Sequence, residues 1–373
     1  MKGKINFFQA CTILMLMNGL TNHVTVNPML LDAAGRDAWI SVIATAVLFI
    51  PWCLLLAMFM NRSGQQELRP WLAERTHPIF AWLLTLPICA NFYLIGAMTV
   101  VHTSSWTITN YLPNTPKFVL ALVLTVFCSL YALWGLRVIA IMSGILLPLV
   151  IVLGIFVSVS NYPEKNFNLL KPYMEHGLSP ILEGMVYAGG GFVELIALIA
   201  MQHRLKSKVR PWGIAIYGII MIYIMLGPLI GAITEFGPAE AAKQMVSPYE
   251  QWRLVKLGSY VEHVDFFSIY QWQAGACVRI GVSIFLFLEM LPIREVGLRK
   301  KLIMLVALSY VMLALFPMNE YSFYLWMYHY YFPISLTVLL TFSLAWIAIS
   351  LFSKRPKEAQ HDRANASRQG TLE

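Results

Sequence analysis

Apolar stretches of about 20 residues recur along the whole chain and are separated mostly by short polar connections. A helix of this length crosses the roughly 30 Å hydrocarbon core of a bilayer, so each stretch predicts a transmembrane helix. The pattern predicts ten such helices and an all-α integral membrane fold. Their approximate bounds are 5–31, 38–60, 79–109, 118–136, 138–159, 178–202, 212–234, 266–291, 301–317 and 331–353.

The composition agrees with a membrane-embedded chain. Of the 373 residues, 58% are hydrophobic and only 12% are charged, and the mean hydropathy is +0.65. A soluble domain with a wetted surface needs a larger polar fraction. The first stretch follows Lys2 and Lys4 as a signal peptide would, but it is long and carries Asn18, Thr21 and Asn22 near its centre, so we interpret it as a retained helix.

The formal net charge of +8 follows a topological pattern. With the N-terminus placed in the cytoplasm, most lysines and arginines fall on the cytoplasmic connections and in the tail, as the positive-inside rule requires. The orientation of the chain in the membrane therefore explains the excess of basic residues, and we expect no nucleic-acid partner. We expect both termini in the cytoplasm, with the polar residues 354–373 forming a disordered tail.

Residues that commonly carry catalysis or bind metals do not form a recognisable group in the sequence. The five cysteines fall inside predicted spans without paired spacing, which is typical of ordinary buried side chains. The chain has no phosphate-binding loop, no metal-ligand spacing and no nucleophile–base signature. We therefore expect neither an enzyme nor a cofactor nor a bound metal.

The ten predicted helices of the domain 1–353 divide into two sets of five, about 5–159 and 178–353. Because five is odd, the second set crosses the membrane in the opposite sense, which permits an inverted repeat. The first helix of each set has weak helix formers at its centre: four of the five residues of Asn-Gly-Leu-Thr-Asn at 18–22, and three glycines at 189–191. Paired interruptions of this kind predict broken helices around a binding site near the membrane midplane.

The glycine triad Gly189, Gly190 and Gly191 has two interpretations. Small residues allow membrane helices to pack closely without any ligand. Three consecutive glycines, each costing about 1 kcal/mol of helix propensity relative to alanine, also suit an unwound segment whose exposed backbone groups a ligand or water satisfies. We favour the unwound, cavity-lining interpretation.

Two ionisable residues fall deep inside predicted spans. Glu194 follows the triad, and Arg279 lies near the middle of 266–291. A charge at this depth costs about 2.5–3.5 kcal/mol on insertion scales, so each needs a partner in the bundle interior. We expect the two to pair, and both a direct role in ligand binding and a purely structural ion pair remain open.

Several stretches together resemble the B-subunit family of spore germinant receptors, a branch of the amino acid–polyamine–organocation transporter superfamily. They are DAWISV at 37–42, LPNTP at 112–116 and SPYEQWRLVKLGSYVEHVDFFSIYQW at 247–272. GGGFVE at 189–194 resembles the sixth-helix break of the superfamily, whereas NGLTN at 18–22 departs from its glycine-rich first break. The resemblance covers essentially the whole chain.

The resemblance implies a five-plus-five inverted-repeat transporter fold in the inner membrane of a spore-forming bacterium. It implies a germinant, typically an amino acid, bound among helices one, three, six and eight, and two protein partners, a membrane A subunit and a lipoprotein C subunit. An amino acid transporter coupled to protons is the alternative. The implied ligand-binding residues are Gly19, Leu20, Thr21, Tyr93, Ala97, Gly189, Gly190, Gly191, Leu195, Ser283 and Phe287.

Overall fold

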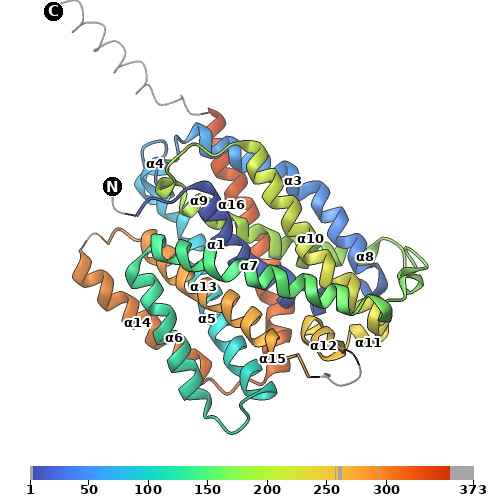
Figure 1. Ribbon diagram of the computed structural model, residues 1–373. Helices are drawn as coiled ribbons and strands as arrows, with labels where there is room; N and C mark the ends of the chain where they lie inside the picture. Colours follow the sequence, from blue (N-terminus) through green and yellow to red (C-terminus); the bar gives the residue numbers. More distant parts are fainter. Residues whose placement is uncertain (1–2, 257, 259–262, 294, 353–373) are drawn as a thin grey trace, which may run out of the picture.

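A computed structural model describes residues 3–256, 258, 263–293 and 295–352, and these form a bundle of helices (Figure 1). The predicted tail at 354–373 lies outside the described residues. The helices are α1 (Phe7–Leu20), α2 (Asn27–Ala34), α3 (Ala38–Arg62), α4 (Leu68–Ala73), α5 (Pro78–Asn110), α6 (Lys117–Trp134), α7 (Leu136–Ser160), α8 (Ser179–Phe192), α9 (Ala197–Ala200), α10 (Pro211–Phe236), α11 (Pro238–Ala241), α12 (Ser247–Leu254), α13 (Phe267–Glu289), α14 (Val296–Ala314), α15 (Glu320–Trp326) and α16 (Phe332–Phe352).

Eight helical stretches of the described chain are long and apolar enough to cross a membrane. The first, Phe7–Arg62, has 56 residues, more than twice the length that one crossing requires. Helix α14 is not among the eight; its first turns carry Arg299, Lys300 and Lys301. The structure thus bears out an all-helical membrane fold, whereas the count of ten spans and the inverted repeat stay predictions from the sequence.

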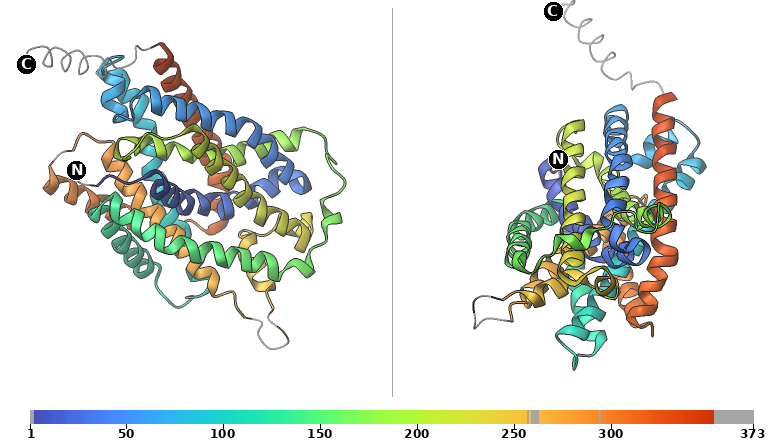
Figure 2. Two further views of the ribbon diagram at one scale, coloured as in Figure 1. Left: turned by 45° about the horizontal axis from the view of Figure 1, so that its top comes forward. Right: turned by 90° about the vertical axis from the view of Figure 1, so that its right-hand side faces the viewer.

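Two elements form the interior of the bundle: helix α13, and the continuous stretch Ser179–Ala200 that contains α8 and α9. In each, 78% of the residues in the most apolar window are buried, against 28% in α7, which runs along the outside (Figure 2). Helix α13 packs against α1, α5, α6 and α7. A Cβ at Gly281 would lie 2.9 Å from the Tyr131 side chain, so glycine permits the close approach of α6.

The glycine triad is helical, and the prediction that it unwinds is wrong. Helix α8 runs through all three glycines to Phe192. Each glycine is buried against another helix: a Cβ at Gly189 or Gly190 would crowd α16, and one at Gly191 would clash with the Asn22 side chain. Close helix packing, the alternative interpretation of the triad, is what the structure contains.

The first helix of each predicted repeat does change its helical form close to the expected place. Helix α1 begins with a reciprocal cap between Asn6 and Gln9 and ends at Leu20, where the π-helical turn η1 (Thr21–Thr25) follows. Helix α8 passes into the 3-10 turn η5 (Val193–Ile196) and then α9. The interruptions are therefore shifted towards the C-terminal side of NGLTN and of the triad, and neither is an extended loop.

The start of the last predicted helix is also corrected. The last stretch begins at Glu320 instead of residue 331, because α15 and the π-helical turn η7 (Met327–Tyr331) continue directly into α16. The connection that follows α10 contains the short helices α11 and α12. Helix α12 lies against α10 and reaches η1, so this connection covers the region where the first helix is interrupted.

Candidate functional site

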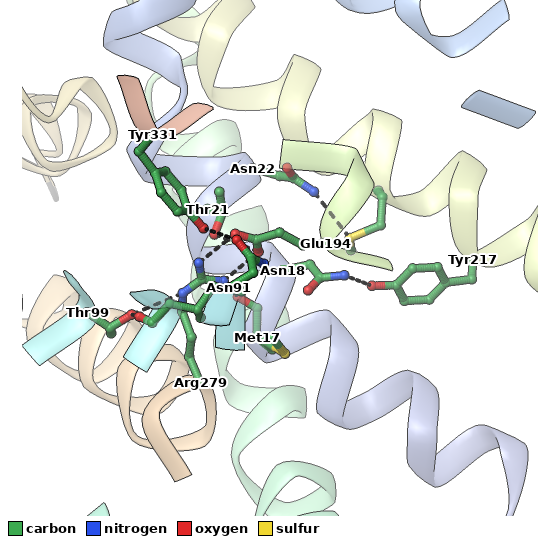
Figure 3. Close-up of polar contacts among 12 residues, drawn as sticks. Met17, Asn18, Thr21, Asn22, Asn91, Thr99, Glu194, Tyr217, Arg279 and Tyr331 are labelled. Atoms are coloured by element: carbon green, nitrogen blue, oxygen red, sulfur yellow. Dashed lines mark hydrogen bonds and ion pairs between the residues drawn. The ribbon is translucent and has the colours of Figure 1, made fainter. Parts of the chain in front are cut away.

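A buried ion pair joins η5 to α13 at the centre of the bundle (Figure 3). The Arg279 Nη1 atom lies 2.6 Å from Glu194 Oε2, and Arg279 Nη2 lies 2.7 Å from Glu194 Oε1. The Arg279 residue is only 5% exposed and Glu194 only 2%. This parallel two-bond geometry pairs the two charges in a site that is almost completely buried.

The turn η1 supplies further partners for this pair. The Thr21 hydroxyl donates to Glu194 Oε2 over 3.1 Å. The backbone N–H of Thr21 bonds to Asn18 O instead of the Met17 carbonyl oxygen that a continuing α-helix would use. That Met17 oxygen accepts from Arg279 Nη1 over 2.8 Å. The interruption of the first helix therefore provides a carbonyl acceptor for the arginine.

One donor of the guanidinium has no partner within the described residues. The Nε atom donates to Thr99 Oγ1 over 3.1 Å. The two Nη1 hydrogens are donated to the Met17 carbonyl oxygen and to Glu194 Oε2. The Nη2 atom has two hydrogens, of which Glu194 accepts one. One Nη2 hydrogen of Arg279 is therefore left for another acceptor.

A small cavity adjoins the ion pair. Its volume is about 20 Å³, room for about one water molecule. Its walls come from the first helix, α5, α13 and the junction of η7 with α16. The lining residues are Leu20, Thr21, Thr25, Met98, Thr99, His102, Thr103, Trp272, Arg279, Met327, Tyr331 and Phe332.

Only some of the sequence-derived site residues line this cavity. Leu20, Thr21 and Arg279 do, and Glu194 is bonded to two of these. Gly19 and Leu195 do not line it, and a Cβ on Gly19 would meet nothing within 4 Å.

Tyr93 and Phe287, the aromatic residues expected around a ligand, lie on α5 and α13 but away from the cavity. The Tyr93 hydroxyl donates to Ser309 Oγ over 2.9 Å, and its ring centroid lies 5.7 Å from that of Phe287. Phe287 comes eight residues after Arg279 on α13, a rise of about 12 Å. Tyr93 and Phe287 therefore belong to a contact of α5, α13 and α14 that is separate from the cavity.

Ala97 and Ser283 are buried, at 4% and 0% exposed, and neither lines the cavity. The Ser283 hydroxyl has no hydrogen-bond partner within the described part of the chain. The triad glycines also lie outside the cavity wall, because they face Asn22, Met225 and α16.

Sequence reasoning missed most of the cavity wall. The polar run His102-Thr103 in the third predicted span was a visible signal, because such groups are costly in a lipid-facing helix. No comparable signal marked Met98 or Met327, which are ordinary apolar residues in sequence. The π-helical turn that contains Met327 was also missed, since it lies in what the hydropathy pattern suggested was a connection.

An aromatic layer covers the cavity on the side of Trp272. The Trp106 and Trp272 rings stack with centroids 4.1 Å apart, and the Trp272 indole N–H donates to Thr103 Oγ1 over 3.0 Å. Tyr111 and Tyr249 make edge contacts with the Trp106 ring. Burial raises the pKa of both phenols above the ordinary tyrosine value, so both stay neutral at physiological pH.

An ionic cluster lies at the C-terminal end of α13, the end away from Trp272. Glu289 Oε1 lies 2.9 Å from His203 Nε2 and accepts from Arg204 Nε over 2.6 Å. Its other oxygen accepts from Arg299 Nη1 over 3.0 Å. One carboxylate thereby ties the turn after α9 and the start of α14 to α13. The described residues contain no group of three or more histidine, cysteine or acidic side chains able to hold a metal ion.

Comparison with known proteins identifies the family. The profile described as "Spore germination protein" matches residues 4–324. The chain is 38% identical to Spore germination protein XB of Bacillus anthracis over 355 residues, which is 95% of this chain and 100% of that protein. It is 24% identical to the Putative spore germination protein YfkT of Bacillus subtilis over 69% of this chain and 71% of that protein.

A transport protein is also similar, more distantly. The Branched-chain amino acid permease BrnQ of Lactobacillus delbrueckii is 25% identical over 57% of this chain and 50% of that protein. The profile match and the relative from Bacillus anthracis cover nearly the whole bundle, including α5, α8 and α13 around the buried ion pair. The chain therefore belongs to the spore germination protein family.

Proposed function

We propose that this chain is the membrane subunit of a nutrient germinant receptor and that it binds a small germinant, an amino acid, beside the Glu194–Arg279 pair. The observation that carries the proposal is the cavity at this pair, where two interrupted helices meet and one Arg279 N–H has no partner among the described residues. Interrupted helices provide backbone groups for ligands in transporter folds.

The charges of the site suit a ligand with no net charge. Glu194 and Arg279 neutralise each other, so the cavity offers neither a cation nor an anion an uncompensated partner. A zwitterion can give its carboxylate to the remaining Arg279 N–H and its ammonium to hydroxyl or carbonyl oxygens. Leu20, Met98 and Met327 in the wall favour an apolar side chain.

Binding requires the site to expand. The cavity of about 20 Å³ holds one water molecule, and an amino acid is several times larger. Flexible methionines and the aromatic layer around Trp106 and Trp272 are the parts of the wall that rearrange most readily. A germinant that binds only the expanded state shifts the population towards it.

Partner subunits would respond to this shift in population towards the expanded state. We propose that the receptor also contains the A subunit and the lipoprotein C subunit that the family resemblance implies. We place the Glu289 end of α13 in the cytoplasm and the Trp106 layer on the outer side, with both termini inside, from the distribution of basic residues. A germinant would then enter from the outer side of the inner membrane.

A ligand-stabilisation screen of the purified chain against single amino acids tests the binding site, because a ligand raises apparent stability by mass action. The Thr25→Leu variant fills the cavity and should abolish stabilisation by the amino acid that stabilises the unmodified protein. The matched Thr337→Leu variant, on the exposed surface of α16, should retain it. Equal stabilisation of both variants would contradict this site.

A proton-coupled amino acid transporter is the second candidate, and the similarity to the permease from Lactobacillus delbrueckii favours it. A receptor derived from a transporter would keep the same bundle and cavity. Uptake of labelled amino acid into liposomes that contain the purified chain separates the two functions. Saturable accumulation driven by a proton gradient would refute the receptor-only function, whereas binding without uptake would support it.

A further inference from the structure

A basic hollow lies at the end of the bundle where α1 and α7 begin. Its volume is about 340 Å³, and its walls are formed by Gly3, Lys4, Arg137 and Lys206. The three cations come from three separate segments: the chain before α1, the first turn of α7 and the connection between α9 and α10. No acidic side chain is among the described residues of its wall.

Backbone hydrogen bonds set the spacing of two of these cations. The Ile5 N–H donates to the Arg204 carbonyl oxygen, and the Lys206 N–H donates to the Ile5 carbonyl oxygen, each over 2.9 Å. Ile5 is 0% exposed and Leu205 5%, so this short parallel bridge is anchored in the core. The neighbouring residues Lys4 and Lys206 are therefore held at the rim of one hollow.

No acidic side chain of the described part of the chain compensates the positive charge of the hollow. Lys4, Arg137 and Lys206 are exposed, and none forms an ion pair with another residue that the structure describes. The nearby Arg204, by contrast, pairs with Glu289. Arg137 also lies in the first turn of α7, where the helix dipole disfavours a cation, and no acidic residue occupies that turn. An anion in the hollow would relieve both unfavourable effects.

Exposed apolar side chains follow two of the three cations, Lys4 and Arg137, along the chain. Phe8 is 75% exposed and lies in the first turn of α1, four residues after Lys4, and Ile141 is 48% exposed and lies one turn of α7 after Arg137. Trp134, 60% exposed, ends α6 beside the same turn. Tryptophan is enriched at the boundary between headgroups and acyl chains, so this end of the bundle has a charged layer above an apolar one.

We propose that the hollow binds the phosphate group of an anionic phospholipid of the adjacent leaflet, with the acyl chains along Phe8 and Ile141. Basic pockets between membrane helices recognise lipid phosphates in this way. A free phosphate offers the same charge but no acyl chains to cover the exposed apolar residues. The inference is independent of the germinant site, because no residue of the hollow lines the cavity beside Arg279.

Native mass spectrometry of the purified full chain tests the proposal by counting retained lipids after titration with phosphatidylglycerol, phosphatidylcholine or inorganic phosphate. We expect one tightly retained phosphatidylglycerol, with at least tenfold weaker retention in the triple variant Lys4→Gln, Arg137→Gln, Lys206→Gln. The matched control Arg210→Gln, Lys300→Gln, Lys301→Gln removes the same charge from exposed positions outside the hollow and should retain the lipid. Helix content and a monodisperse elution profile verify that both variants fold.

Four results would overturn the proposal. Equal loss of lipid in the two triple variants would mean that only net charge matters. Equal retention of phosphatidylcholine would remove the role of the anion. Inorganic phosphate that displaces phosphatidylglycerol at equal concentration would assign the hollow to a soluble phosphate. An acidic peptide such as oligoglutamate that displaces the lipid at lower concentration would assign it to a protein partner.

Discussion

The Glu194–Arg279 pair makes a quantitative prediction about stability. The variants are Glu194→Leu, Arg279→Met and the combination of both, each apolar and of similar size to the residue it replaces. Removing one partner of a buried pair leaves an uncompensated charge and costs about 3–5 kcal/mol. Each single variant should therefore lower the folding equilibrium constant by about a hundredfold to a few thousandfold at 1.4 kcal/mol per factor of ten.

The double variant should cost less than either single variant. It leaves no charge at this site, and its main remaining cost is the Met17 carbonyl oxygen that loses the Arg279 donor. The Thr21 hydroxyl also loses its Glu194 acceptor, but it lines the cavity, where a water molecule can accept from it. An unsatisfied buried acceptor costs about 1–3 kcal/mol, while Thr99 keeps a bond to the Ile95 carbonyl oxygen. The predicted coupling between the two positions is thus several kcal/mol.

Reversible unfolding in mixed micelles with increasing denaturing detergent, followed by tryptophan fluorescence, measures these free energies. The control is Glu183→Leu on the same helix α8, because Glu183 is exposed and bonds to Tyr328 over 3.1 Å. Its expected cost is about 0–1 kcal/mol, and it adds to the effect of Arg279→Met. Additive costs for Glu194→Leu and Arg279→Met would refute the reasoning, because they would show that the two charges do not stabilise each other.

Three further predictions concern packing and the two ends of α13. Gly190→Ala should cost about 1–3 kcal/mol of unfolding free energy in the same assay because its Cβ would lie 2.8 Å from a ring on α16, whereas Gly227→Ala, with nothing within 4 Å, should be neutral or stabilising. Glu289→Gln should cost about 1–3 kcal/mol, less than a fully buried pair because its partners are part-exposed, and should speed proteolysis of the α13–α14 connection. Trp272→Phe should keep the ring stack but lose about 1 kcal/mol with its N–H bond, and Trp272→Leu should lose more; equal losses would contradict a role for stacking.

The sequence was informative about the first-helix interruption and less so about the second. Asn18 to Asn22 are weak helix formers, and the helix changes form at Thr21. Glycine, in contrast, suits both an unwound segment and a tightly packed helix, and only the neighbours decide between them. At Gly191 the neighbour is Asn22, from a helix about 170 residues away in the chain, which no local pattern indicates.

The surroundings of the expected ligand-binding residues also could not be predicted from local sequence patterns. Helical periodicity places Tyr93 and Thr99 on one helix but does not say which of them meets Arg279, because the register between α5 and α13 is set by packing. Tyr93 instead bonds to Ser309 of α14. The methionines of the cavity wall carry no signal in sequence, since their role depends on what faces them.

Hydropathy, composition and the cost of a deep charge determined from sequence alone that the chain is a helical membrane protein and that Glu194 and Arg279 need partners inside the bundle. These features depend on transfer from water to lipid, which each residue undergoes whatever its neighbours are. Tertiary structure alone decided that the triad stays helical, that the Met17 carbonyl oxygen turns to Arg279 and that the cavity opens beside Met98 and Met327. Those outcomes depend on how distant helices pack, and packing is a property of pairs of surfaces that no single segment specifies.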